Sequence, residues 1–103
     1  MKLKVRIEAE AEAQIAQLDA WWREHRTAAT SLKELLAETF QKMAEAPYAA
    51  PVYLEVGGEQ VRRRGIKTTP YAVYYWIDKQ RGDIAVISIW STQRGRGPAL
   101  KVR

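Results

Sequence analysis

The chain has 103 residues, 47% hydrophobic and 28% charged, and this composition is typical of one globular domain. It contains no cysteine and a single histidine, His25, which excludes disulfides and thiolate nucleophiles and argues against sites built from paired histidines. The apolar runs of the chain, such as that at residues 84–87, are all far shorter than the ~20 residues of a membrane-spanning helix. We therefore expect one cytoplasmic domain over residues 1–103, with no metal, no cofactor and no membrane contact.

Charge is distributed unevenly along the chain. Residues 1–60 carry seven Lys and Arg against ten Asp and Glu, a net charge of −3, whereas residues 61–103 carry ten against two, a net charge of +8. A C-terminal half this basic predicts attraction to an anionic partner, such as nucleic acid, a nucleotide or an acidic protein segment. A solvated basic face that only maintains solubility explains the same charge equally well.

The first half of the chain predicts one strand and two helices. Residues 3–7 alternate apolar and basic side chains, which is the period-two pattern of a strand with one solvated face. In residues 8–26 and 32–46, apolar side chains recur every three or four positions, as they do in amphipathic helices. Ser31 and Glu34 have the spacing of a capping box at the start of the second helix. A short turn between these segments predicts a hairpin of two antiparallel helices.

The second half predicts a sheet. Residues 61–66, 71–77 and 84–90 are rich in β-branched and aromatic side chains, and the last two segments are apolar on both faces, as central strands are. Residues 78–83 have the composition of a hairpin turn. Residues 47–60 contain prolines and a glycine pair, and they predict a surface connection with a short extended piece at residues 52–56.

The order of these elements predicts an α+β domain. An N-terminal strand and a helical hairpin precede a three-stranded antiparallel meander, and the helices pack on one face of the sheet. The first strand is expected beside the late strands, in the middle or at the edge, but its partner is not defined by the pattern. Residues 91–103 are glycine-containing and basic, and we expect them to form a flexible tail.

The most concentrated functional signal is a run of three arginines followed by a lysine. On a strand, Arg62 and Arg64 point to one face, and Arg63 and Lys67 point to the other. The planar guanidinium group suits phosphate and carboxylate groups, so this strand is a candidate site for a polyanion or an acidic partner helix. The alternative is that the charges protect an edge strand from aggregation.

The remaining candidates carry weaker signals. Arg94 and Arg96 follow the last predicted strand among glycines that allow close approach of a ligand, although a flexible basic tail explains them equally well. Most aromatic residues of the strands are expected in the core rather than as platforms for stacked bases. Trp21 lies off the apolar stripe of its helix, and an exposed tryptophan there would mark a protein interface. His25 lies near the helix end, where a cation is favourable, and we expect no catalysis from it.

Three segments, QVRRRGI, TPYAVYYWID and IAVISIWSTQRGRGP, follow a basic first strand and a predicted helical hairpin. In this order and spacing, they resemble the RelE/ParE superfamily of bacterial toxins from type II toxin–antitoxin operons. The resemblance covers about residues 3–98 and is strongest to the ParE type, the plasmid-stabilisation toxins. It implies a small toxin that is neutralised by a cognate antitoxin, which is encoded beside it and wraps across it.

The two branches of this superfamily imply different activities. RelE-type members are ribosome-dependent endoribonucleases, whose site combines basic residues of the sheet with an arginine after the last strand and a C-terminal tyrosine. Here Arg63 and Lys67 fall near the basic positions, but Thr92 replaces that arginine, and no tyrosine follows Tyr75. ParE-type members look like inhibitors that bind DNA gyrase. The resemblance therefore implies a gyrase inhibitor, with an mRNA endoribonuclease or a member without toxicity as the alternatives.

These considerations assign roles to the basic residues. The antitoxin is expected to contribute an acidic amphipathic segment, and the residues expected to bind it are Arg62, Arg63 and Arg64. The target is expected to be DNA gyrase, or ribosome-bound mRNA in the alternative, and the residues expected to bind it are Lys67, Arg94 and Arg96. No catalytic residue is expected, because no proton carrier is predicted beside these cations.

Overall fold

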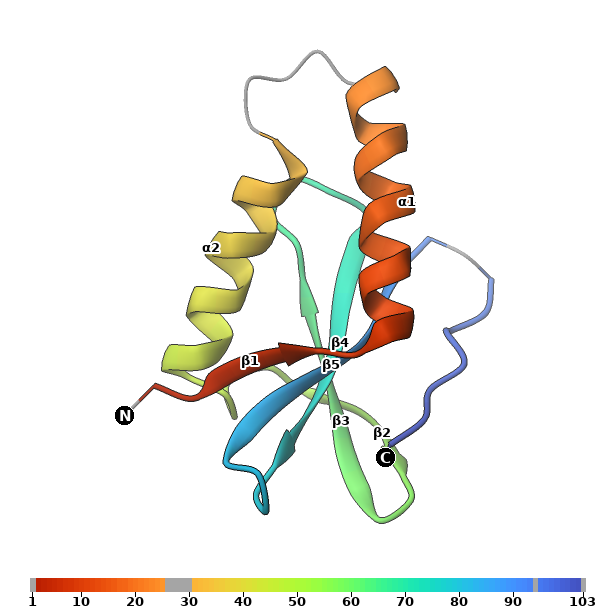
Figure 1. Ribbon diagram of the computed structural model, residues 1–103. Helices are drawn as coiled ribbons and strands as arrows, with labels where there is room; N and C mark the ends of the chain where they lie inside the picture. Colours follow the sequence, from red (N-terminus) through yellow and green to blue (C-terminus); the bar gives the residue numbers. More distant parts are fainter. Residues whose placement is uncertain (1, 26–30, 94, 103) are drawn as a thin grey trace.

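The computed structural model describes residues 2–25, 31–93 and 95–102 (Figure 1). Over these residues the chain forms two helices and one five-stranded sheet, in the order β1, α1, α2, β2, β3, β4, β5. Both helices lie on the same side of the sheet (Figure 1), and residues of both contribute to one core with that face. The predicted α+β class and the packing of the helices on one face are therefore confirmed.

The two helices begin and end close to their predicted positions. α1 spans Ala9–His25 and α2 spans Leu32–Glu45, and they run in opposite directions (Figure 1). The Ser31 hydroxyl accepts a hydrogen bond from the Glu34 N–H at 3.1 Å, which satisfies one of the free donors at the start of α2. Most of the predicted turn between the helices, residues 26–30, lies outside the described residues.

The strand order in the sheet is β1-β5-β4-β3-β2. Four strands are consecutive in the chain and antiparallel to their neighbours: β2 (Val52–Val56), β3 (Glu59–Gly65), β4 (Tyr71–Asp78) and β5 (Asp83–Ser91). The meander therefore has four strands, and the prediction of three was wrong because it left β2 in a surface connection.

β2 was underestimated because its side chains give no alternating pattern. Four of its five residues are exposed, so the sequence VYLEV lacks the apolar and polar alternation of a half-buried strand. Gly57 and Gly58 form the tight turn to β3, with φ angles of 58° and 82° that glycine adopts without strain. This glycine pair is the local feature of the sequence that predicts a hairpin at β2.

β1 (Lys4–Ile7) forms the other edge of the sheet and runs parallel to β5, in register with residues 83–86. It is only four residues long and therefore covers only the first part of β5. Beyond it, the side chain of Gln14 in α1 contacts the edge of β5. Its Oε1 accepts hydrogen bonds from the Ile89 N–H at 2.8 Å and from the Ser88 hydroxyl at 3.2 Å. α1 is thereby fastened directly to the sheet.

Apolar side chains cover both faces of the central strands β4 and β5, as their composition predicted. The larger cluster lies on the helix side and includes Trp22, Met43 and Tyr75. The cluster on the opposite face consists of Val61, Ala72, Tyr74, Trp76, Ala85 and Ile87. Leu100 and Val102 pack against this second cluster. The segment after β5, which has no helix or strand in its described residues, therefore covers part of the face that the helices leave open.

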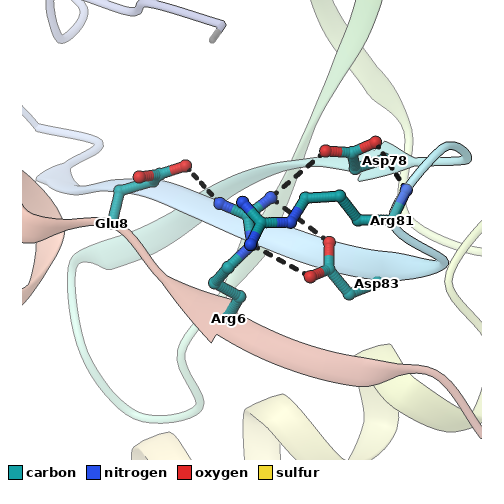
Figure 2. A network of polar contacts seen from close by, with 5 residues as sticks. All are labelled: Arg6, Glu8, Asp78, Arg81 and Asp83. Atoms are coloured by element: carbon teal, nitrogen blue, oxygen red, sulfur yellow. Dashed lines mark hydrogen bonds and ion pairs between the residues drawn. The ribbon is translucent and has the colours of Figure 1, made fainter.

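A polar network joins β1 to the ends of β4 and β5 (Figure 2). The Arg6 guanidinium donates to both carboxylate oxygens of Asp83, from Nε at 2.9 Å and from Nη2 at 3.3 Å. It also donates to Glu8 at 2.6 Å and to Asp78 at 3.3 Å. Asp78 lies directly opposite Asp83 in the sheet, where two carboxylates repel each other unless a cation lies between them. The hydrogen bond to Asp83 raises the pKa of Arg6, against the opposing effect of burial.

The buried hydroxyl of Tyr75 links β4 to the end of the helical hairpin. It donates a hydrogen bond to the Pro47 carbonyl at 2.9 Å. Burial raises the pKa of Tyr75 above its ordinary value, although the positive charges of Arg62 and Arg64 act in the opposite direction. The phenol is therefore held in its neutral form.

We expect Tyr75→Phe to lower the free energy of unfolding by about 1 kcal/mol at pH 7, because one buried hydrogen bond is lost. Above about pH 10 the unfolded chain releases a tyrosine proton that the folded chain retains, so wild-type stability falls as the pH rises. The variant lacks this pH-dependent loss of stability. The difference in the free energy of unfolding between the two proteins should therefore narrow as the pH rises. Urea unfolding from pH 7 to 11 measures both effects, and Tyr48→Phe, at an exposed ring, is the control. An unchanged midpoint at pH 7 would contradict the role of the hydroxyl.

Candidate functional site

The arginine run lies on β3, and strand alternation divides its guanidinium groups between the two faces of the sheet. Arg62 and Arg64 are paired in register with residues of β4 that belong to the helix-side core. Arg63 is paired with Tyr74, which belongs to the cluster on the opposite face. The three arginines therefore lie on the two faces of the sheet as the alternation predicted. A partner that binds one face of the sheet contacts either Arg63 or the pair Arg62 and Arg64.

Arg62 is bound by the chain itself. Its Nη1 donates to the carbonyl oxygens of Tyr48 at 3.0 Å and Ala50 at 2.6 Å. Its Nη2 reaches the side-chain oxygen of Gln60 at 3.4 Å, and the guanidinium carbon lies 5.2 Å from the centre of the Tyr48 ring. Because both carbonyl groups belong to the connection between α2 and β2, Arg62 holds this connection against the sheet.

Arg63 projects from the open face beside two tyrosines. Its guanidinium carbon lies 5.0 Å from the centre of the Tyr53 ring, which is a cation–π distance. The Tyr53 ring meets the ring of Tyr74 edge-on, with 5.1 Å between the two centroids. Tyr74 is buried, so this pair of rings gives the exposed Arg63 a supported position.

The segment after β5 brings Arg96 to the same place. The indole N–H of Trp90 donates to the Arg96 carbonyl at 3.0 Å, and Gly97 lies so close to the Tyr53 hydroxyl that a Cβ atom would clash with it. A hollow of about 150 Å³ results, which we call the arginine hollow. It is lined by Tyr53, Arg63, Tyr74, Ser91, Thr92, Gly95, Arg96 and Gly97. Two arginines and four residues with hydroxyl groups thus line a single site, and no carboxylate-bearing residue is among them.

The two arginines of the hollow have no carboxylate partner among the described residues. In the described part of the chain, ion pairs within 4 Å are made by Lys2, Arg6, Arg23 and Lys42. The positive charge of the hollow is therefore uncompensated by its immediate surroundings, which favours an anionic ligand there.

The other two residues expected to bind the target are not lining residues of the hollow. β3 ends at Gly65, so the exposed Lys67 lies in the connection to β4, and the prediction that strand alternation sets its face is wrong. This connection is tied to the rim of the hollow, because the Thr92 N–H donates to the Pro70 carbonyl at 2.7 Å. Arg94 lies outside the described residues.

Sequence analysis missed the residues that bring Arg63 and Arg96 together. Tyr53 was assigned to a surface connection, and Trp90 had no predicted role beyond the strand. The glycines of the tail were interpreted as allowing a ligand to approach the backbone. At Gly97 the close neighbour is instead the Tyr53 hydroxyl of the same chain. The glycines thus correctly indicated that another group comes close to the backbone, but the sequence did not show that this group is a side chain of the same chain.

A second groove, of about 440 Å³, lies between α1 and the ends of β4 and β5. It is lined by Gln14, Gln17, Leu18, Trp21, Tyr71, Ile89, Trp90 and Ser91. Trp21 is 46% exposed, which confirms that it lies off the buried stripe of α1. Its ring stacks on His25 with 4.6 Å between the centroids, so this histidine supports an exposed aromatic surface. The role of Trp21 in a protein interface stays a prediction.

Other kinds of site find no support within residues 2–25, 31–93 and 95–102. No group of three or more His, Asp or Glu side chains in these ranges is arranged to hold a metal ion. Neither helix found there combines the length and the apolar character that crossing a bilayer requires.

Comparison with known proteins identifies the family of this chain. The chain matches a family described as the ParE toxin of the type II toxin–antitoxin system parDE, over residues 5–95. The protein is therefore a toxin of the type II toxin–antitoxin class, and this class implies an antitoxin as its partner. Within that class the chain belongs to the ParE toxin family, as its resemblance to the ParE type indicated. Neither the curated proteins nor the solved structures contain a match to it.

Proposed function

We propose that this toxin inhibits DNA gyrase by binding to it, and that a cognate antitoxin neutralises the toxin by covering its basic surface. The observation that carries the proposal is the match to the ParE toxin family over residues 5–95. The arginine hollow supports binding rather than cleavage, because its lining contains no histidine, lysine or carboxylate to transfer a proton, and its two tyrosines are used in packing: Tyr74 is buried, and the Tyr53 hydroxyl lies against Gly97. A gyrase inhibitor of this kind consumes no substrate.

The antitoxin contact is proposed at Arg62, Arg63 and Arg64 and at the neighbouring edge strand. β2 is a free edge of the sheet, and its apolar side chains at positions 52–54 are exposed. An exposed apolar edge beside basic residues suits an acidic segment of the partner that adds a strand to the sheet. Because Arg62 already donates to two carbonyl groups of its own chain, we expect Arg63 and Arg64 to contribute most of the ion pairs.

The target contact is proposed at Lys67, Arg94 and Arg96. Lys67 is exposed, and Arg96 lines the arginine hollow. Thr92, at the rim of the hollow, is hydrogen-bonded to the connection that carries Lys67, which supports a shared contact surface for these cations. Positive charge at such a surface attracts an assembly that carries DNA.

A supercoiling assay tests this function. Purified toxin added to gyrase and relaxed plasmid should inhibit supercoiling and increase the amount of cleaved DNA. The double variant Lys67→Ala, Arg96→Ala should need at least a tenfold higher concentration for the same inhibition, because two target contacts are lost. Arg81→Ala is the matched control, since Arg81 is exposed in the turn between β4 and β5. The antitoxin from the neighbouring reading frame should restore supercoiling.

Three results would reject the proposal. Undiminished supercoiling at saturating toxin is the first. The second is discrete breaks in ribosome-bound message, detected by primer extension in a translation extract and lost in Lys67→Ala or Arg94→Ala, which would indicate a ribonuclease. The third is normal growth when the toxin is expressed without its antitoxin, which would show that this member has lost toxicity.

A further inference from the structure

Arg63 enters the arginine hollow with its hydrogen-bond donors available. Its guanidinium is supported by the face of the Tyr53 ring, a contact that uses none of its N–H groups. No hydrogen bond or ion pair joins this guanidinium group to another described residue, although the backbone N–H of Arg63 donates to the Pro51 carbonyl. Arg62 differs, because it donates to carbonyl groups of its own chain. Arg63 is thus positioned by an aromatic ring and left free to donate to a ligand.

Arg96 reaches the hollow from a segment that is held at two points. The Trp90 indole fixes its carbonyl at 3.0 Å, and Gly97 rests against the Tyr53 hydroxyl. Gly95 and Gly97 flank Arg96: the missing side chain of Gly97 makes room for the Tyr53 hydroxyl, and no atom lies within 4 Å of the position that a Cβ of Gly95 would take. The same tyrosine therefore contacts Arg63 on one side and the chain beside Arg96 on the other.

The size and the lining of the hollow suit one small oxyanion. Its volume of about 150 Å³ leaves room for such an ion. Two guanidinium groups supply planar pairs of donors, which match the oxygens of phosphate or carboxylate. The hydroxyl groups of Tyr53, Tyr74 and Ser91 add donors from other directions, whereas the Thr92 hydroxyl already donates to the Pro70 carbonyl at 3.1 Å. Donors on several sides favour a tetrahedral phosphate over a planar carboxylate.

We propose that the arginine hollow is a phosphate-binding site, and that a phosphodiester of gyrase-bound DNA occupies it. The phosphate chemistry follows from the lining of the hollow, whereas the assignment to DNA rests on the proposed function. The hollow opens on the face of the sheet that no helix covers, so a polymer backbone can cross it. Arg63 and Arg96 bind the phosphate oxygens, and Tyr53 is the positioning residue that keeps the two arginines together.

Phosphate binding is measured on the full chain by following backbone amide resonances during titration with inorganic phosphate. We expect saturable shifts at Gly95, Gly97 and Tyr53, and no such shifts with chloride at the same ionic strength. Arg63→Gln and Arg96→Gln should each weaken phosphate binding at least tenfold. Arg81→Gln removes one exposed positive charge from the turn between β4 and β5 and should bind phosphate as the wild type does.

Tyr53→Phe keeps the ring that supports Arg63 and removes one hydroxyl, so it tests the site without removing a charge. We expect it to weaken phosphate binding about threefold and to leave the rest of the amide spectrum unchanged. This variant keeps the proposal testable even if an arginine variant fails to fold. Absence of saturable shifts with phosphate, or equal binding by wild type, Arg63→Gln and Arg96→Gln, would overturn the site.

Two further titrations identify the source of the phosphate. A short DNA duplex should shift the same amides at lower concentration than inorganic phosphate, and more strongly than single-stranded RNA of the same length. Tighter binding of the RNA would overturn the assignment to DNA. These titrations contain no gyrase, so they test the site separately from the proposed function. If the toxin inhibits gyrase but its hollow binds no phosphate, the phosphate site is rejected and the proposed function is retained. Phosphate binding by a toxin that does not inhibit gyrase would reject the proposed function and, with it, the assignment to gyrase-bound DNA.

Discussion

Replacing Arg6 with methionine should lower the free energy of unfolding by about 3 kcal/mol. The methionine fills a similar volume but leaves the carboxylates of Asp78 and Asp83 opposite each other without the cation that lies between them. The Arg6 side chain is only 24% exposed, so water compensates only part of this loss. The effect is expected to be large because removing one member of a partly buried ionic network leaves the others uncompensated.

Chemical denaturation measured by circular dichroism checks this prediction. Arg23→Met is the matched control, because Arg23 pairs with Asp19 at 3.1 Å while its side chain is 69% exposed. That variant should lose at most about 0.5 kcal/mol, as exposed pairs spaced four residues apart on a helix do. The double variant Arg6→Met, Asp83→Asn should be more stable than Arg6→Met alone, since one uncompensated charge is removed. Equal midpoints for wild type and Arg6→Met would show that the network contributes nothing to stability.

Replacing Arg62, Arg63 and Arg64 together with alanine should weaken the antitoxin complex at least 100-fold, or about 2.7 kcal/mol. Hydrogen bonds to charged groups contribute about 1.5–3 kcal/mol each, so the loss of even two ion pairs accounts for this effect. Arg63→Ala and Arg64→Ala should each weaken binding more than Arg62→Ala does. Arg62 makes its present hydrogen bonds to the α2–β2 connection, and its loss should appear mainly as reduced stability.

Calorimetric titration with the antitoxin from the neighbouring reading frame measures these affinities. The control variant Lys4→Ala, Lys33→Ala, Arg81→Ala removes the same number of positive charges from exposed positions elsewhere. It should bind the antitoxin within about threefold of the wild type, because charges on the rim of an interface or outside it contribute little to affinity. Thermal unfolding establishes that each variant is folded. An unchanged affinity of the folded triple arginine variant would reject the role of the arginine run in antitoxin binding.

The contrast between Arg6 and Arg63 shows how environment separates structural from functional arginines. Arg6 is surrounded by three carboxylates, so its charge is used to join β1 to the sheet. Arg63 lies against an aromatic ring and has no carboxylate partner among the described residues. Replacing Arg6 should therefore change stability first, whereas replacing Arg63 should change the binding of partners first.

Local sequence patterns were sufficient for most of the fold. The helices, β4, β5 and the turn between these two strands were predicted because each pattern depends on residues close together in the chain. The turn contains Gly82 with a φ of 68°, a conformation that glycine favours. The extended piece at residues 52–56 was predicted, but it was not counted as a strand of the sheet, because its exposed side chains are not selected by contact with the core.

The pairing of β1 and the composition of the site were decided by tertiary structure. β1 pairs with β5 because β5 is the edge strand of the meander and is free to accept a neighbour. Both helices lie between β1 and β5 in the sequence, so no local pattern predicts this pairing. The sequence by itself determined that positive charge is concentrated after residue 60 and that Arg62, Arg63 and Arg64 lie on a strand. Only the tertiary structure brought Arg96 to Arg63, because the path of the segment after β5 depends on contacts with Trp90 and Tyr53. Such contacts form between side chains distant in sequence, and only after the sheet has brought their strands together.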